Sequence, residues 1–564
     1  MAFGLIDQVI FYGTISISLA IGAYFGFYKK PQSADDYLLG DRKMKVIPVA
    51  LSAAVSHVSG ALLLGQSADV YVYGVNATWN ILACLLSSVI SVFLFVPVVT
   101  KLNISNSFEY LELRFDRRIK IMASCVYTMY LLLYNPVVAY VPAITYSQVT
   151  GVNPQIVAPI LCVICVFYTT VGGFKAVVWT DVFQFLGIMT GIFMVIVLGV
   201  TSVGFDVIVD RAAHGHRLDL NFSFNPTLRD GFWHIIIGGT TTWIFSLSFH
   251  PVTVQRYLSL SRFSSVQRVM AIQACVIGLL IFICSVVGLI MYATYNTCDP
   301  ITTGEVSRAD QLLPYFVMDV GRGIPALSGV FLAGIFSASL STLSSSFNTM
   351  AAIIYGDMLA PFLSRNFLHG KETWILKLIV VILGAVTTCF TVLIERMGGV
   401  FPLVIALLGL VYGILGGIFL LGVLFPKANS LGALLGTITS TFAIGTIAVL
   451  NHWYSLQGAN EKFIKPISVE GCLVPTNVTL VRKHLEHEPF VLFRISFWYN
   501  SVMAVLVVII VGLLVSCVTK QSTVDPSLLS PISRTDCSKR NCRQKYVAGL
   551  SQSDQTVYNF QRDV

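Results

Sequence analysis

Apolar runs long enough to cross a membrane recur from one end of this chain to the other, and they restrict its fold more than any other feature. A helix needs about 20 apolar residues to span a bilayer, and about thirteen such runs lie between residues 4 and 518. Hydrophobic residues make up 55% of the chain and charged residues 11%, which is too apolar for a soluble globular protein. The sequence therefore predicts an all-α polytopic membrane protein with about thirteen transmembrane helices.

The first run and the distribution of Lys and Arg together predict the orientation of the chain in the membrane. It contains Asp7, has no basic segment before it and is too long for a secretory signal, so we expect it to remain as the first span. An odd number of spans puts the two termini on opposite sides, and Lys and Arg are more numerous in the loops that an outer N-terminus places inside. We therefore expect a plasma-membrane protein with its N-terminus outside and its C-terminus in the cytoplasm. The net charge of +8 reflects this topology, and no basic stripe with interleaved aromatic residues indicates nucleic-acid binding.

A hydroxyl-rich stretch, residues 338–346, interrupts the apolar sequence of the ninth run. At helical spacing, one face of this stretch carries Ala338, Ser341, Thr342 and Ser345. Neutral oxygen atoms on one face suit a hard monovalent cation. The alternative is that the hydroxyls bond to the preceding turn and allow close helix packing, and the stretch by itself leaves both open.

Two other runs carry residues that interrupt a helix at membrane depth. The second run, 46–73, crowds small and polar residues near its middle, and the seventh, 232–254, contains His250 followed by Pro251, which has no backbone donor. Non-helical backbone at this depth is tolerated only where it is buried or lines a cavity. The two runs are five spans apart, as expected for inverted repeats with a binding site between them. Close packing of small residues is the alternative for the second run.

Four short motifs connect the chain with a known family. They are the loop 36–43, Ser-Phe-Glu-Tyr-Leu-Glu-Leu-Arg-Phe at 107–115, Gly-Gly-x-x-Ala-Val-x-x-Thr-Asp-x-x-Gln at 172–184, and Val-Gln-Arg-Tyr at 254–257. Each resembles a motif of the sodium/solute symporter family, in the same order relative to the spans. The resemblance implies a LeuT-like fold of inverted five-helix repeats. Thirteen expected spans with no further helix after 518 resemble the family's multivitamin, monocarboxylate and iodide branch.

The spans and the resemblance together divide the chain. The expected parts are a first transmembrane helix with an inner loop at 1–45, a first repeat of spans 2–6 at 46–204, an outer loop at 205–231, a second repeat of spans 7–11 at 232–428, spans 12–13 at 429–518 with an outer loop at 454–492, and a disordered cytoplasmic tail at 519–564. The tail assignment rests on its polar composition.

The resemblance also implies the sodium ligands. The common sodium site of the family joins the broken second span to the ninth, and here it would use the carbonyl oxygens of Val55, Val58 and Ala338 and the hydroxyls of Ser341 and Thr342. A second sodium, present in some members, would use Asp181, Ser345 and Ser346. Asp181 also fits the simpler role of a carboxylate near a helix start. We assign no other metal and no cofactor.

The resemblance places the solute between the second and seventh spans, at His57, Leu62, Phe245, Phe249 and His250. The polar groups that sugar-carrying members have at matching positions are absent, so a polyol is disfavoured. Helix N-termini at a break attract carboxylates. The expected solute is a small organic anion such as a monocarboxylate or a vitamin.

The predicted outer loops carry candidate modification sites. Cys298 and Cys472 lie where a disulfide would persist, and both a disulfide and two free thiols fit the sequence. Asn221 and Asn477 each begin a glycosylation sequon in a segment placed outside.

The expected function is sodium-coupled symport of a small organic solute across the lipid bilayer. One alternative is a sodium leak or channel, which needs a continuous pore, but nothing in the sequence resembles a selectivity filter. Another is a solute-sensing transceptor, which would arise if His57 and His250 prevented transport. An enzyme is not expected, because no nucleophile elbow, phosphate loop or zinc motif occurs.

Overall fold

The computed structural model describes residues 3–102, 104, 106–321, 324–363, 371–394, 400–472, 488–519 and 524–538. These residues are almost entirely helical and include no β-strand. The α-helices are α1 (Leu5–Ala23), α2 (Ala34–Leu39), α3 (Val46–Val55), α4 (Gly60–Tyr73), α5 (Asn80–Leu94), α6 (Val96–Val99), α7 (Glu109–Arg114), α8 (Arg117–Thr150), α9 (Pro154–Val203), α10 (Phe205–His214), α11 (Phe232–Ser248), α12 (Pro251–Leu258), α13 (Phe263–Tyr295), α14 (Leu312–Val320), α15 (Leu327–Ile353), α17 (Glu372–Ile394), α18 (Val400–Leu424), α19 (Ser430–Leu456), α20 (Asn500–Val518) and α21 (Pro531–Ser538).

The long apolar helices of the structure correspond to the apolar runs of the sequence. Within the described residues, nine helices are long and apolar enough to cross a membrane, and the bent pair α3 and α4 makes a tenth span. Helix α9, with its 50 residues, holds two of the expected runs. They meet at Gly173, whose φ of +61° lies in the left-handed region and whose Cα faces the ring of Tyr37. The pair α11 and α12 and the helix α18 correspond to two further runs, and the exact number of thirteen stays a prediction.

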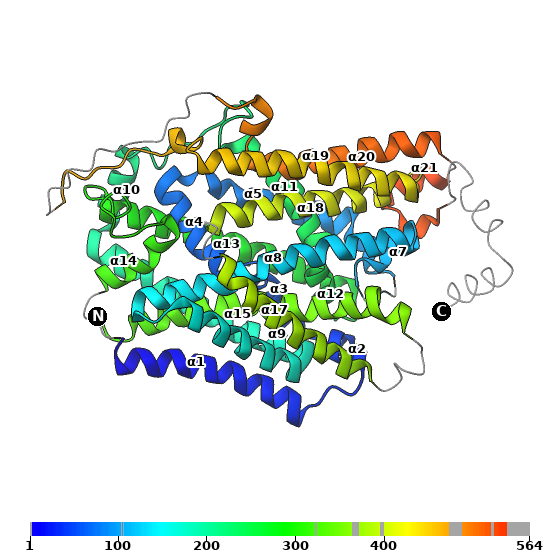
Figure 1. Ribbon diagram of the computed structural model, residues 1–564, viewed down its shortest axis with the longest axis horizontal. Helices are drawn as coiled ribbons and strands as arrows, with labels where there is room; N and C mark the ends of the chain where they lie inside the picture. The colour runs from blue at the N-terminus through cyan, green and yellow to red at the C-terminus, as the bar shows by residue number, and fades with distance from the viewer. Residues whose placement is uncertain are drawn as a thin grey trace.

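Helix α15 lies at the centre of the bundle and α1 at its edge. In the apolar window of α15, 89% of the residues are buried, compared with 22% in α1. Figure 1 shows the long helices running roughly along the long axis of the molecule, with α15 packed against α9, α8 and α1. The most hydroxyl-rich span is therefore also the one most enclosed by protein.

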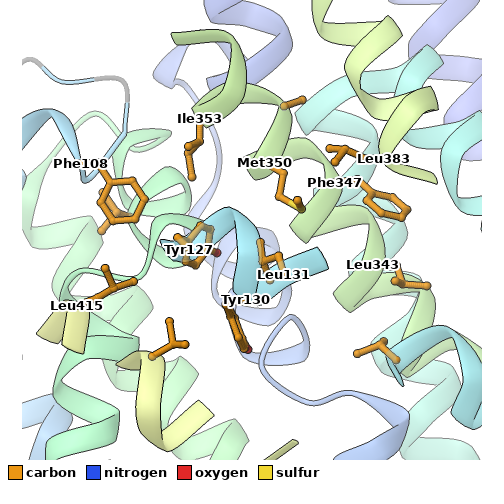
Figure 2. Packing of buried hydrophobic residues seen from close by; sticks show 14 of the residues in the cluster. Phe108, Tyr127, Tyr130, Leu131, Leu343, Phe347, Met350, Ile353, Leu383 and Leu415 are labelled. Atoms are coloured by element: carbon orange, nitrogen blue, oxygen red, sulfur yellow. The ribbon is translucent and has the colours of Figure 1, made fainter. Parts of the chain in front are cut away.

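The core around α15 is made of large side chains from several helices. Figure 2 shows Met350 of α15 on the side of Tyr127 and Leu131 of α8, whereas Phe347 of α15 points to the other side, near Leu383 of α17. Lipid tails are as apolar as these side chains, so close packing rather than exclusion from water holds such helices together.

The first and last described helices lie at opposite ends of the bundle. Helix α1 begins at the left of Figure 1 and α21 lies at the right. Helices α10 and α14, which belong to segments expected outside, lie at the end where α1 begins, whereas α2 and α7 lie toward the other end. This arrangement is compatible with termini on opposite sides of a membrane, and which end faces the cytoplasm stays a prediction.

Part of the segment expected to be a disordered tail is folded. Within 519–564, residues 524–538 include α21 and pack on the bundle. Tyr110 Oη donates to the Leu528 carbonyl at 3.0 Å, and the Ser530 amide donates to the Val423 carbonyl at 3.0 Å. Leu529 is completely buried. The polar composition of the whole segment conceals these few apolar residues, which is why the prediction was wrong here; residues 520–523 and 539–564 lie outside the described residues.

The loops at the α10 end contain a disulfide. It joins Cys298 to Cys472 and so ties the loop after α13 to the loop after α19. Asn221 is partly buried, and its side-chain amide donates to the Asp230 carbonyl at 3.2 Å. Asn477 lies outside the described residues, and glycosylation at both positions stays a prediction.

Candidate functional site

The first break separates α3, which ends at Val55, from α4, which begins at Gly60 and is bent from α3 by 58°. The Ser59 side chain caps α4 by accepting from the Leu62 amide at 3.4 Å. A Cβ at Gly60 would lie 2.7 Å from Ser339 Oγ, so the break sits directly on α15. The predicted interruption of the second run is confirmed.

The second break separates α11, which ends at Ser248, from α12, which begins at Pro251. The amides of Phe249 and His250 both donate to the Phe245 carbonyl at 2.9 Å, which closes the end of α11. Pro251 then starts α12, where its missing donor costs nothing because a first-turn amide has no helical partner. The predicted interruption of the seventh run is also confirmed.

His57 connects the two breaks. Its ring nitrogens lie 2.8 Å from Thr253 Oγ1 of α12 and 3.3 Å from Ser246 Oγ of α11. The centroids of the His57 and His250 rings are 5.5 Å apart. A side chain on the first broken span thus holds both halves of the second.

A cavity of about 130 Å³ lies between the broken spans. Its wall is rich in aromatic side chains, namely Tyr130, Tyr134, Trp243, Tyr412, Phe497 and Trp498. None of its described lining residues is Asp, Glu, Lys or Arg. Such a cavity fits a small solute that is bound by aromatic surfaces and neutral hydrogen-bonding groups.

Three of the five predicted solute residues line this cavity: His57, Leu62 and His250. The Nε2 atom of His250 lies 3.3 Å from Tyr127 Oη, which is a long hydrogen bond. The Nδ1 atom of His250 has no hydrogen-bond partner within the described residues. A bound solute with a polar atom would satisfy this nitrogen.

The other two predicted solute residues are corrected by the structure. Phe245 and Phe249 are fully buried and lie outside the cavity lining. Phe249 stacks on Phe419 of α18 with ring centroids 4.5 Å apart, and Phe245 packs against Tyr412 at 5.0 Å. At the end of a broken helix the direction of a side chain depends on the local backbone turn, so the resemblance did not place these rings.

The residues predicted to bind the first sodium come from the break of α3 and from α15, which the structure packs together. Thr342 lines the cavity, and its hydroxyl donates to the Ala338 carbonyl at 3.1 Å. The Val55 carbonyl accepts from the Val58 amide at 3.0 Å, and the Ser341 hydroxyl donates to Asp181 Oδ1 at 2.6 Å. In each of these contacts the oxygen keeps a lone pair with which it can bind a cation.

The residues predicted for a second sodium surround a buried ion pair. Asp181 of α9 and Arg256 of α12 lie 3.1 Å apart, and their side chains are 0% and 1% exposed. Asp181 Oδ2 also accepts from Ser52 Oγ at 2.5 Å. Ser345 Oγ accepts from Arg256 Nη2 at 2.6 Å, whereas Ser346 Oγ donates to Asn135 Oδ1 at 2.8 Å. The structure brings Asp181 and Ser345 together and turns Ser346 toward another helix.

Sequence reasoning missed the role of Arg256 and most of the aromatic wall. An arginine inside a buried span is a signal in itself, because such a charge needs a partner. For the wall, the spacing of Tyr130 and Tyr134 on one face of α8 was the available signal. No pattern linked them to Tyr412 or Trp498, which come from other helices.

The known proteins that are similar to this chain include sodium-coupled transporters. The family model described as "Sodium:solute symporter family" matches residues 37–440. The chain is 36% identical to the sodium-coupled monocarboxylate transporter 1 of Homo sapiens, covering 92% of this chain and 88% of that protein. It is 34% identical to the sodium-coupled monocarboxylate transporter 2 of Mus musculus, covering 94% and 87%. It is 32% identical to the sodium/iodide cotransporter of Homo sapiens, covering 93% and 86%.

Solved structures share the fold. A Na+-coupled sialic acid symporter superposes with a TM-score of 0.76 at 20% identity, covering 92% of this chain and 99% of that one. Mhp1, a nucleobase-cation-symport-1 family transporter, superposes with a TM-score of 0.50 at 14% identity, covering 88% and 97%. The prediction of a LeuT-like all-α membrane fold is therefore confirmed.

Proposed function

The chain belongs to the sodium:solute symporter family, and we propose that it carries a small monocarboxylate anion together with sodium. It is a multi-pass membrane transporter rather than an enzyme, and sodium is its coupling ion. The solute, the plasma membrane as its location, the outer N-terminus and the individual ion ligands are parts of the proposal.

The cavity between the broken spans carries this proposal. Its volume of about 130 Å³ is below the roughly 300 to 1,000 Å³ of cavities that hold drug-sized ligands. That size favours a short carboxylate over a vitamin. Relatives that are named monocarboxylate transporters cover most of the chain, which supports the same class.

An uncharged cavity needs a nearby cation if it is to hold an anion. Thr342 belongs both to the cavity wall and to the proposed sodium ligands, so the ion would lie next to the solute. A sodium ion there offsets the carboxylate charge in a low-dielectric interior, where an unpaired charge is costly. Sodium would then raise solute affinity, and the solute would raise sodium affinity by the same factor.

The charge carried per solute follows from this arrangement. One sodium and one monocarboxylate move together without net charge, so a tenfold sodium gradient supports roughly tenfold accumulation, or ~1.4 kcal/mol. A second sodium would make transport electrogenic. Current per transported solute therefore reports the number of ions.

Uptake into cells that express the full chain tests the proposal. Labelled lactate, butyrate, biotin, iodide, glucose and choline are compared in sodium and in N-methylglucamine, with surface expression measured in parallel. Saturable, sodium-dependent uptake of the short monocarboxylates is the expected result. Uptake of biotin or iodide in their place would overturn the assigned solute class.

The same assay separates the rival functions. Sodium current without uptake of any solute would indicate a leak or channel. Binding of a monocarboxylate without uptake, in protein that reaches the surface, would indicate a transceptor.

A further inference from the structure

The guanidinium of Arg256 already occupies the position that the second sodium would take. Its Nη2 donates to Asp181 Oδ2 at 3.1 Å and to Ser345 Oγ at 2.6 Å. It also donates to Ser56 Oγ at 2.6 Å, and Nε donates to Ser52 Oγ at 2.9 Å. Of the three residues expected to hold a second sodium, Asp181 and Ser345 both contact this arginine.

We propose that Arg256 is a built-in competitor of sodium at Asp181. The inference rests on the sodium coupling of the proposed function and deepens it. In the conformation described, Arg256 neutralises Asp181 and a second sodium does not bind there. A sodium ion reaches Asp181 only when the Arg256 side chain has moved away.

Charge balance makes the two occupants alternatives. Asp181 is completely buried, and an unpaired carboxylate in that setting is strongly destabilising. One positive charge is enough to neutralise the Asp181 carboxylate. Sodium added beside Arg256 would leave a net positive charge in the same buried space, because no other acidic side chain among the described residues forms an ion pair with Asp181 or Arg256. The pocket around Asp181 therefore takes one cation at a time.

The position of Arg256 connects this competition to the moving parts of the site. Arg256 belongs to α12, the half-helix that follows the second break, and its Nη1 also donates to the Val252 carbonyl of α12 at 3.0 Å. Its other partners lie on α3, in the break after α3, on α9 and on α15. A shift of α12 relative to these helices would withdraw the guanidinium and expose Asp181 to sodium.

A purely structural bridge is the rival explanation for the same contacts. A bridge predicts that losing Arg256 destabilises the protein whether or not sodium is present. Competition predicts that sodium replaces the lost positive charge. The sodium dependence of stability distinguishes the two.

The test measures thermal stability of the purified full chain in detergent as sodium replaces N-methylglucamine at constant ionic strength. We expect Arg256→Gln to be destabilised without sodium and to recover with sodium, with a half-stabilising concentration roughly tenfold below that of the wild type. Arg256→Lys keeps the positive charge and should resemble the wild type. Arg268→Gln, an exposed arginine on α13, is the matched control and should also be unchanged.

The double variant Asp181→Asn with Arg256→Gln completes the design. It removes both charges, so its half-stabilising sodium concentration should return to the wild-type value or rise above it. An Arg256→Gln protein that is equally unstable in both cations, or whose half-stabilising concentration is unchanged or higher, overturns the inference.

Solute uptake by the wild-type chain shows whether a negative result overturns the inference about Arg256 or the proposed function as well. A wild-type chain whose uptake does not depend on sodium overturns the proposed function and the inference together. Sodium-dependent wild-type uptake with an unchanged Arg256→Gln stability curve overturns only the inference.

Discussion

The two broken spans use the same backbone device for different chemistry. The break between α3 and α4 contains serines and lies on the hydroxyl-rich face of α15. The break between α11 and α12 contains an aromatic ring and an imidazole and lies against the aromatic residues of α8 and α18. Under the proposed function, the first break offers oxygen atoms to a cation, and the second offers a neutral, ring-lined surface to a solute.

The difference shows where a broken helix gets its specificity. Both breaks free backbone groups from the helix, which provides polarity at membrane depth. The side chains of the neighbouring helix decide what that polarity can bind. His57 lies at the first break and contacts both helices of the second, so we expect the two breaks to be coupled through it.

Loss of a proposed ion ligand should have the largest effect and should act on sodium alone. Removing an outer partner of a metal ligand costs about 10- to 100-fold in affinity, and Thr342→Ala removes a proposed ligand itself. We expect the half-saturating sodium concentration for uptake to rise by at least about tenfold. Thr190→Ala, an exposed hydroxyl on α9, is the control. An unchanged sodium curve in Thr342→Ala would remove this residue from the ion site.

Removing the connection between the breaks should have the next largest effect. His57→Phe keeps a ring and deletes both hydrogen bonds to α11 and α12. Coupling free energies of 1–3 kcal/mol correspond to roughly 5- to 150-fold changes in affinity. We therefore expect the solute KM to fall at least fivefold between low and high sodium in the wild type and to become nearly independent of sodium in the variant. His214→Phe on the exposed helix α10 controls for loss of an imidazole.

A variant that retained the full sodium effect on KM would show that the communication bypasses His57. The two breaks would then be linked through the contact of Arg256 with Ser56, or through α15 or α18.

Loss of the imidazole at the second break should act on the solute alone. A neutral hydrogen bond contributes about 0.5–1.5 kcal/mol, so His250→Phe should raise the solute KM by up to about tenfold. Its half-saturating sodium concentration should stay within about twofold of the wild type at saturating solute. Uptake titrations in solute and in sodium measure both values. A change in the sodium curve equal to the change in KM would mean that the breaks are not chemically distinct.

The smallest effect is expected for a change at Phe249, the residue that precedes His250 in the sequence. Phe249 stacks on Phe419 and lies outside the cavity lining, so Phe249→Leu should cost about 1 kcal/mol of stability and leave the solute KM unchanged. Thermal melting in detergent and an uptake titration test these two statements. A rise in KM comparable to that of His250→Phe would place Phe249 in contact with the solute after all.

Much of the candidate site could be found from the sequence because its signals are local. The interruptions near the middle of 46–73 and at His250 follow from small residues and a proline inside apolar runs. The oxygen-bearing face of α15 follows from helical spacing. The cavity wall could not be found in this way, because Tyr130, Trp243 and Tyr412 come from three helices whose packing no local pattern specifies.

The sequence by itself determined that this chain is a bundle of membrane helices with two interrupted spans, because span length, helix breaking and hydroxyl spacing are properties of short segments. Only the tertiary structure decided that Phe249 faces the core, that residues 524–538 dock on α7 and α18, and that Arg256 pairs with Asp181. Asp181 and Arg256 are 75 residues apart, and a buried charge takes whichever partner the packed helices bring within reach.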